Sequence, residues 1–134
     1  MNILFVDDRP EFKVQYAIEY LKRKNLNFNY EILKSVNSAL RYLANPSNKF
    51  DLAIVDLGLP QFDNGQGYGQ LKGLIIVNEI FIRDMDIPII INSTTEIPNE
   101  KEYLKQFTDD TPNAIVKHME FLDLNWITEF VIKH

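Results

Sequence analysis

Several short apolar runs in this chain are followed directly by polar side chains that suit phosphoryl chemistry. Asp7-Asp8, Asp56, Ser93 and Lys117 stand at these positions, far apart in the sequence. Carboxylates are hard oxygen ligands that suit Mg²⁺, and an aspartate can also be a nucleophile that becomes an aspartyl phosphate. A metal ion, a lysine and a hydroxyl group can together hold the three oxygens of a transferred phosphoryl group. The set therefore indicates metal-assisted phosphoryl transfer.

Each of these residues also has an ordinary structural explanation when it is taken alone. Asp7-Asp8 can end a strand and cap a helix, Asp56 can be a turn residue, and Ser93 can be an N-cap. Lys117 alone would be a solvated surface charge. The combination is more specific than any one member, provided that the fold brings the residues together.

The elements that would bring them together alternate regularly between strand and helix. Apolar runs rich in strand formers predict strands at Ile3–Val6, Tyr30–Lys34, Leu52–Val55, Ile87–Asn92 and Ala114–Val116. Helical periodicity, caps and helix stops predict helices at Val14–Leu21, Ser38–Ala44, Leu74–Arg83, Glu100–Phe107 and Leu122–Ile132. This order predicts an α/β fold, a parallel sheet with helices on both faces and right-handed crossovers. Ligands bind at the carboxyl ends of the strands in such sheets, which is where the polar residues stand.

Length and composition limit the remaining possibilities. The chain has 134 residues, which suits one domain. Fourteen basic and nineteen acidic residues give a net charge of −5, which argues against a non-specific grip on nucleic acid. There is no cysteine for a disulfide or thiolate site, and no apolar run approaches the ~20 residues of a membrane helix. We expect a cytoplasmic protein.

The chain resembles the receiver domain of bacterial two-component response regulators from Asn2 to Ile132. The resemblance rests on four segments: Ile3-Leu4-Phe5-Val6-Asp7-Asp8, Asp51-Leu52-Ala53-Ile54-Val55-Asp56-Leu57-Gly58-Leu59-Pro60, Pro88-Ile89-Ile90-Ile91-Asn92-Ser93, and Lys117. It implies a flavodoxin-like, doubly wound, five-stranded parallel sheet with strand order 2-1-3-4-5. Residues 1–134 would then form a single receiver domain with a glycine-rich insertion around 61–73.

The resemblance also implies a role for each site residue. Asp56 would be the phosphoacceptor, and Mg²⁺ would be held by Asp7, Asp8, Asp56 and the backbone carbonyl of Gly58. Ser93 would be the switch hydroxyl that turns toward the phosphoryl group, and Lys117 would pair with a phosphoryl oxygen. Such a domain catalyses only its own phosphorylation and dephosphorylation, so we do not expect a conventional enzyme.

The partners that the resemblance implies are proteins. The phosphoryl donor would be a histidine kinase or a histidine phosphotransfer protein, and the output would be binding to a downstream protein target. Direct binding to DNA or to a membrane is not expected. A homodimer through the fourth and fifth helices, with Tyr103, Leu104 and Phe107 on its face, is left open.

One departure from the family pattern lies between the third strand and the third helix. The loop Gln61–Gly73 is longer than usual and holds four glycines, so we expect it to be mobile. Gly73 would replace the glycine that normally follows Pro60 closely. The loop is either a tolerated surface insertion or a lid that serves a particular partner.

Other departures lie near the phosphoryl site itself. His118 follows Lys117 where the family has proline after a cis bond, and a non-proline cis bond costs about 2.5–4 kcal/mol. We therefore expect either a trans bond, which would displace Lys117, or a strained cis bond; His118 itself is expected to be a partly exposed structural residue. Thr94 replaces a smaller residue, and Ala114 stands where the family has an aromatic switch residue.

Other functions remain open alongside a phosphorylated receiver. A receiver-like binding module that is never phosphorylated is suggested by Thr94, His118 and Ala114. An aspartyl-phosphate hydrolase is disfavoured because Asp56-Leu57-Gly58 lacks the second aspartate of an Asp-x-Asp motif. The glycines of residues 65–69 lack the spacing of a dinucleotide-binding loop.

Overall fold

The computed structural model describes residues 1–83, 86–110 and 115–134, which form five strands and five helices in alternation. The strands are β1 (Asn2–Val6), β2 (Asn29–Leu33), β3 (Leu52–Val55), β4 (Ile89–Asn92) and β5 (Val116–Met119). The helices are α1 (Lys13–Arg23), α2 (Val36–Ala44), α3 (Gly73–Ile82), α4 (Glu100–Asp110) and α5 (Leu124–Lys133). The order that the sequence predicts is therefore confirmed.

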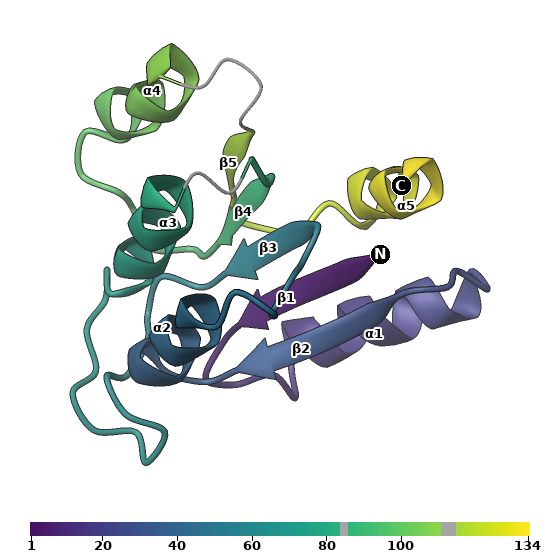
Figure 1. Cartoon of the computed structure of the whole chain (residues 1–134), viewed down its shortest axis with the longest axis horizontal. Helices are drawn as coiled ribbons and strands as arrows, with labels where there is room; N and C mark the ends of the chain where they lie inside the picture. The colour runs from purple at the N-terminus through teal and green to yellow at the C-terminus, as the bar shows by residue number, and fades with distance from the viewer. Residues whose placement is uncertain (84–85, 111–114) are drawn as a thin grey trace.

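The strands form one parallel sheet with the order β2-β1-β3-β4-β5 (Figure 1). Val6 of β1 lies opposite Val55 of β3, and Val55 lies opposite Ile91 of β4. The carboxyl ends of the three central strands therefore lie at one level along the same edge. This register brings the segments after β1, β3 and β4 together, and both the flavodoxin-like fold and its strand order are confirmed.

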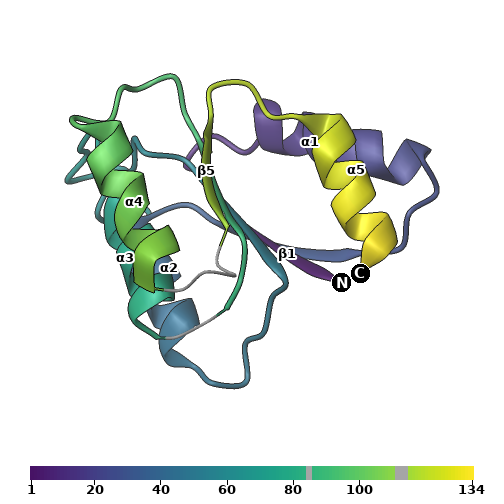
Figure 2. The same ribbon diagram turned by 90° about the horizontal axis from the view of Figure 1, so that it is seen from above.

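The helices form two layers, with α2, α3 and α4 on one face of the sheet and α1 and α5 on the other (Figure 2). Successive residues of a strand point to opposite faces, so β1 supplies Leu4 and Val6 to one core and Ile3 and Phe5 to the other. A strand buried on both faces must be apolar throughout, which explains the continuous runs in the sequence. No helix in the described part of the chain combines the length and the apolar character needed to span a bilayer.

Phe107 belongs to the core and not to an exposed dimer face. Its side chain is 1% exposed and packs edge-on against Phe81 of α3 and Tyr103 of α4, with ring centroids 5.0 and 5.3 Å apart. The expectation that Phe107 contributes to a homodimer surface is therefore wrong.

The fifth strand is shifted along the chain relative to its expected position. The sequence predicts it at Ala114–Val116, but β5 continues through Met119 and therefore contains Lys117 and His118. The strand lies at the edge of the sheet and is only partly buried, so its apolar pattern is weak. Ala114, the position compared with an aromatic switch, lies outside the described residues.

The glycine-rich loop before α3 is closed by hydrogen bonds, and its expected mobility stays a prediction. The backbone amides of Leu59 and Gly69 each donate to the other's carbonyl, at 3.2 and 3.0 Å. The amide of Gln61 reaches the carbonyl oxygen of Gln66 at 3.0 Å, and Lys72 Nζ donates to Gln61 Oε1 at 3.2 Å. The loop therefore folds back on itself as an irregular hairpin beside the carboxyl end of β3.

Gly73 begins α3 at a position where no side chain fits. Its amide donates to the carbonyl of Leu57 at 2.9 Å, and a Cβ atom there would lie 2.8 Å from Leu57 Cα and collide with the carbonyl oxygen of Asp56. Glycine lets the first turn of α3 rest directly on the backbone that carries Asp56.

Candidate functional site

Three carboxylates meet at the carboxyl edge of the sheet. Asp7 and Asp8 follow β1, Asp56 follows β3, and one oxygen of each lies within 4.8 Å of the others. The Asp56 amide donates to the carbonyl of Val6 at 2.9 Å, which extends the β1–β3 pairing to the site. The sequence-based expectation that these three side chains converge is confirmed.

Burial makes the ionised state of two of these carboxylates unfavourable. Asp7 is 3% exposed, and desolvation, aided by the neighbouring charge of Asp56, raises its pKa to about 6 although the Arg9 amide donates to Asp7 Oδ1 at 2.8 Å. Burial also raises the pKa of Asp8, with the charge of Asp56 as a further cause. Three hard oxygen ligands held this closely fit Mg²⁺ or a similar divalent cation, which would neutralise the repulsion.

A polar pocket opens beside the cluster and contains the expected hydroxyl. Ser93 follows β4 and is 4% exposed, and its Oγ accepts a hydrogen bond from the Thr95 amide at 3.2 Å. The described residues that line the pocket are Asp8, Arg9, Lys13, Asp56, Gly58, Gly65, Tyr68, Ser93, Thr94 and Thr95. The structure thus brings Ser93 and Gly58 to the same pocket as Asp8 and Asp56.

Tyr68 adds a wall to this pocket from the glycine-rich loop. A Cβ atom at Gly58 would collide with the hydroxyl of Tyr68, so the tyrosine lies directly over the Gly58 backbone. Gly65 from the same loop also lines the pocket. The loop that the sequence marks as an insertion therefore borders the candidate site.

Lys117 does not reach this pocket. It lies within β5 opposite Ile90, its side chain is exposed, and its Nζ lies 5.4 Å from the centre of the Trp126 ring on α5. The expectation that Lys117 follows the last strand and faces Asp56 is wrong in its placement. The cause is the shift of β5, which turns this side chain toward the α1–α5 layer.

His118 faces the opposite side of β5 from Lys117. The peptide bond between the two residues is trans. His118 Nε2 donates to the carbonyl oxygen of Ser93 at 2.8 Å, and Nδ1 contacts Glu100 Oε1 of α4. Its side chain is 14% exposed, so the predicted partial exposure is confirmed, and its structural role stays a prediction.

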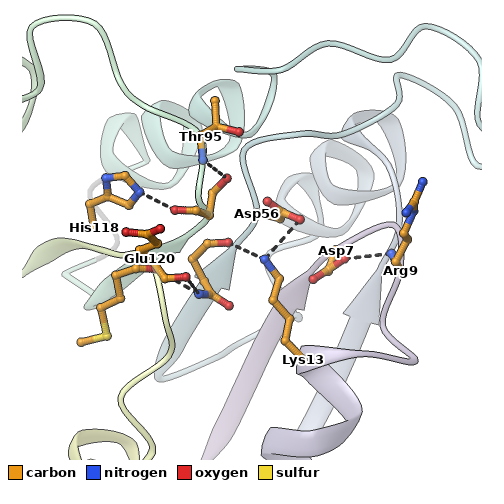
Figure 3. Close-up of polar contacts among 10 residues, drawn as sticks. Asp7, Arg9, Lys13, Asp56, Thr95, His118 and Glu120 are labelled. Carbon is orange, nitrogen blue, oxygen red and sulfur yellow. Dashed lines mark hydrogen bonds and ion pairs between the residues drawn. The ribbon is translucent and has the colours of Figure 1, made fainter.

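Lys13, which the sequence did not single out, places its ammonium at the candidate site (Figure 3). Its Nζ lies 3.4 Å from Asp56 Oδ2 and donates to the carbonyl oxygen of Asn92 at 2.8 Å. One signal was present in the sequence. A cation in the first turn of a helix is disfavoured by the helix dipole, so Lys13 at the start of α1 needs another partner.

The fold of this chain is shared with many solved structures. A response regulator receiver domain protein from Methanospirillum hungatei is 17% identical, with 98% of this chain and 90% of that chain covered at a TM-score of 0.64. The response regulator TrrA from Thermotoga maritima, in complex with Mg²⁺ and BeF, is 20% identical, with coverages of 98% and 96% and a TM-score of 0.59. The Mn²⁺-bound response regulator Rcp1 is 19% identical, with coverages of 97% and 88% and a TM-score of 0.65.

Comparisons based on sequence do not identify a family for this chain. No protein-family model matches the chain, and no curated protein matches it. The structural likeness extends over nearly the whole length of both partners in each pair. The chain therefore has the fold of the response regulator receiver domains.

Proposed function

We propose that this chain is a phosphoacceptor receiver domain of a two-component phosphorelay. The observation that carries the proposal is the convergence of Asp7, Asp8 and Asp56 within 4.8 Å, with Ser93 in the adjoining pocket. A cluster of this kind has no evident structural use, because the burial of mutually repelling carboxylates destabilises a fold.

Asp56 is the nucleophile in this proposal. Its side chain is 18% exposed, so it is open to an incoming donor yet partly shielded from water. A carboxylate oxygen of Asp56 attacks the phosphorus of a phosphohistidine on a histidine kinase or phosphotransfer protein. The new P–O bond forms as the P–N bond breaks, and the imidazole leaves with the bonding pair and takes up a proton.

The remaining residues bind and stabilise the transferred group. Asp7, Asp8 and Asp56, with the carbonyl of Gly58, would hold Mg²⁺, which supplies positive charge to the phosphoryl oxygens. The metal-bound neighbours TrrA and Rcp1 share the fold, which is consistent with this choice of ion. Ser93 would donate its hydroxyl to a phosphoryl oxygen, and its reorientation would pass the change to a separate protein target.

Labelling with a small phosphodonor tests the proposal. Wild type incubated with acetyl phosphate and Mg²⁺ is expected to gain about 80 Da, the mass of one phosphoryl group, by intact mass spectrometry. Asp56→Asn should gain nothing, and chelation of the metal should abolish the gain in wild type. Asp86→Asn, which removes an exposed carboxylate outside the cluster, is the matched control and should be labelled normally.

Absence of an Asp56-dependent gain would refute the proposal. It would favour the alternative, a receiver-like module that binds its partner without phosphorylation. Binding of Mg²⁺ by such a protein would then have a structural purpose only.

A further inference from the structure

We infer that Lys13, and not Lys117, supplies the ammonium group that binds the phosphoryl oxygens on Asp56. The inference rests on the proposed function, because it assigns a residue to the same site. It starts from the position of Lys13 Nζ, which lies 3.4 Å from Asp56 Oδ2 and is fixed by a 2.8 Å hydrogen bond to the Asn92 carbonyl (Figure 3).

The position of Lys13 Nζ is set by two neighbouring strands. Asp56 follows β3, and Asn92 ends β4, so the ammonium lies over the gap between their carboxyl ends. Asn92 is 3% exposed, and its Nδ2 donates to the carbonyl of Met119 at 3.0 Å, which fixes the residue that receives Lys13. The ammonium is therefore held beside the carboxylate that would accept the phosphoryl group.

The fifth strand offers no ammonium to the site in the part of the chain that is described. Lys117 extends to the Trp126 ring on the α1–α5 side. The residue that β5 directs to the Ser93 segment is His118, and Glu120 lies next to it in the pocket between that segment and α4. An imidazole and a carboxylate thus occupy the side from which a lysine was expected.

Arg9 is the other cationic side chain among the described residues of the pocket. Its backbone amide bonds Asp7, but its exposed side chain extends away from Asp56 (Figure 3). Lys13 is therefore the cation that stands next to the proposed nucleophile.

The chemistry of transfer requires a cation at this place. Charge on a transferring phosphoryl group is spread over three oxygens, and positive groups near them lower the barrier. A lysine ammonium is a compact charge on a flexible stem, so Nζ can move from Asp56 Oδ2 to a phosphoryl oxygen on the same carboxylate. With acetyl phosphate, the new P–O bond to Asp56 forms as the bond to acetate breaks; Lys13 keeps its protons throughout.

A lysine that merely neutralises the acidic cluster would behave differently from one that binds the phosphoryl group. Removal of the charge in Lys13→Gln takes away a cation that competes with Mg²⁺, so Mg²⁺ affinity measured by calorimetry should be equal or higher in either case. Once the metal site is saturated with Mg²⁺, the rate of Asp56 labelling should depend on Lys13 only if Lys13 binds the phosphoryl group. The test is therefore made at saturating Mg²⁺.

The experiment compares wild type, Lys13→Gln, Lys13→Arg and the control Lys117→Gln, each first shown to be folded by thermal unfolding. We expect Lys13→Gln to lower the rate of Asp56 labelling by acetyl phosphate about a hundredfold, the lower end of the ~10²–10³-fold cost of losing one preorganised donor. It should also weaken binding of beryllofluoride, a phosphoryl mimic, observed by ¹⁹F NMR. Lys13→Arg should retain part of both, and Lys117→Gln should match wild type.

The outcomes separate this inference from the proposed function. A wild-type protein that takes no label on Asp56 overturns the proposed function and the inference together. If wild type is labelled but Lys13→Gln reacts and binds beryllofluoride as well as wild type does, only the inference fails. A loss in Lys117→Gln as large as that in Lys13→Gln also overturns the inference.

Discussion

His118 Nε2 on β5 donates a hydrogen bond to the carbonyl oxygen of Ser93 at 2.8 Å. The other ring nitrogen contacts Glu100 in the first turn of α4. One side chain therefore connects the segment that carries the candidate switch hydroxyl with the start of the next helix. This connection is built from polar contacts of the imidazole ring.

Replacement of His118 tests whether that connection stabilises α4. His118→Ala should lower the free energy of unfolding by about 1–3 kcal/mol, because two polar partners lose their contact in a mostly buried place. Amides of α4 should also exchange faster with solvent, as hydrogen-exchange NMR would show. Lys117→Gln, one residue away on the other face of β5, should leave α4 exchange unchanged. Equal exchange in the two variants would show that His118 does not hold the helix.

The raised pKa of Asp7 predicts a dependence of stability on pH in metal-free buffer. The pKa is raised from 3.8 to about 6, so the native state binds the proton more tightly than the unfolded chain does. Stability should therefore fall as the pH rises from about 4 to 6, at a cost of about 3 kcal/mol from this group above pH 6.

Asp7→Asn isolates that contribution, because asparagine keeps an oxygen that can accept from the Arg9 amide but carries no charge. We expect urea denaturation with a chelator to show little difference from wild type near pH 4 and a more stable variant above pH 6. If Asp7→Asn were more stable than wild type by the same amount near pH 4 and above pH 6, the pH dependence could not be assigned to the ionisation of Asp7.

Gly73→Ala should destabilise the protein although alanine is the better helix former. The added methyl would meet the backbone of Asp56 and Leu57, and overpacking of this kind costs about 1–3 kcal/mol. Gly69→Ala is the control, since the atoms nearest to its methyl would belong to the flexible side chain of Lys72 and not to the backbone. The free energy of unfolding, measured with denaturant, should be clearly lower for Gly73→Ala than for Gly69→Ala. A lower value for Gly69→Ala would mean that α3 does not rest on the Asp56 backbone.

The ammonium of Lys72 should keep the glycine-rich loop closed. Lys72 Nζ donates to Gln61 Oε1 and to the Gly67 carbonyl, so Lys72→Met removes both bonds while it keeps an apolar stem. Amides of Gln61 and Phe62 should then exchange faster, while those of β3 keep their protection. Unchanged exchange at Gln61 would show that the backbone bonds alone hold the loop.

Much of the fold could be predicted because its central strands are buried on both faces. Leu52–Val55 matches β3 at both ends, since an apolar run stopped by Asp56 leaves little freedom in the boundaries. The convergence of Asp7, Asp8 and Asp56 followed from the same runs, because parallel strands end at a common edge.

The errors lie where the sequence signal is mixed. β5 lies at an edge of the sheet and has two adjacent polar residues, Lys117 and His118, between two apolar ones, so no apolar run marks where the strand ends. The assumed end at Lys117 placed that side chain in the site, and a small shift of the strand moved it to the other face. Lys13 was missed because the predicted helix begins at Val14, so the position of this cation in the first turn of α1 was not apparent.

Asn92 connects the end of β4 with the start of α1 and with the segment that precedes α5. Its carbonyl receives Lys13 from the start of α1, and its side chain holds the carbonyls of Met119 and Glu120 on the approach to α5. Hydrogen bonds of the buried Asn92 thus link the starts of α1 and α5, the two helices of one layer, to the end of β4. We therefore expect a displacement of Asn92 to disturb contacts at the starts of both α1 and α5.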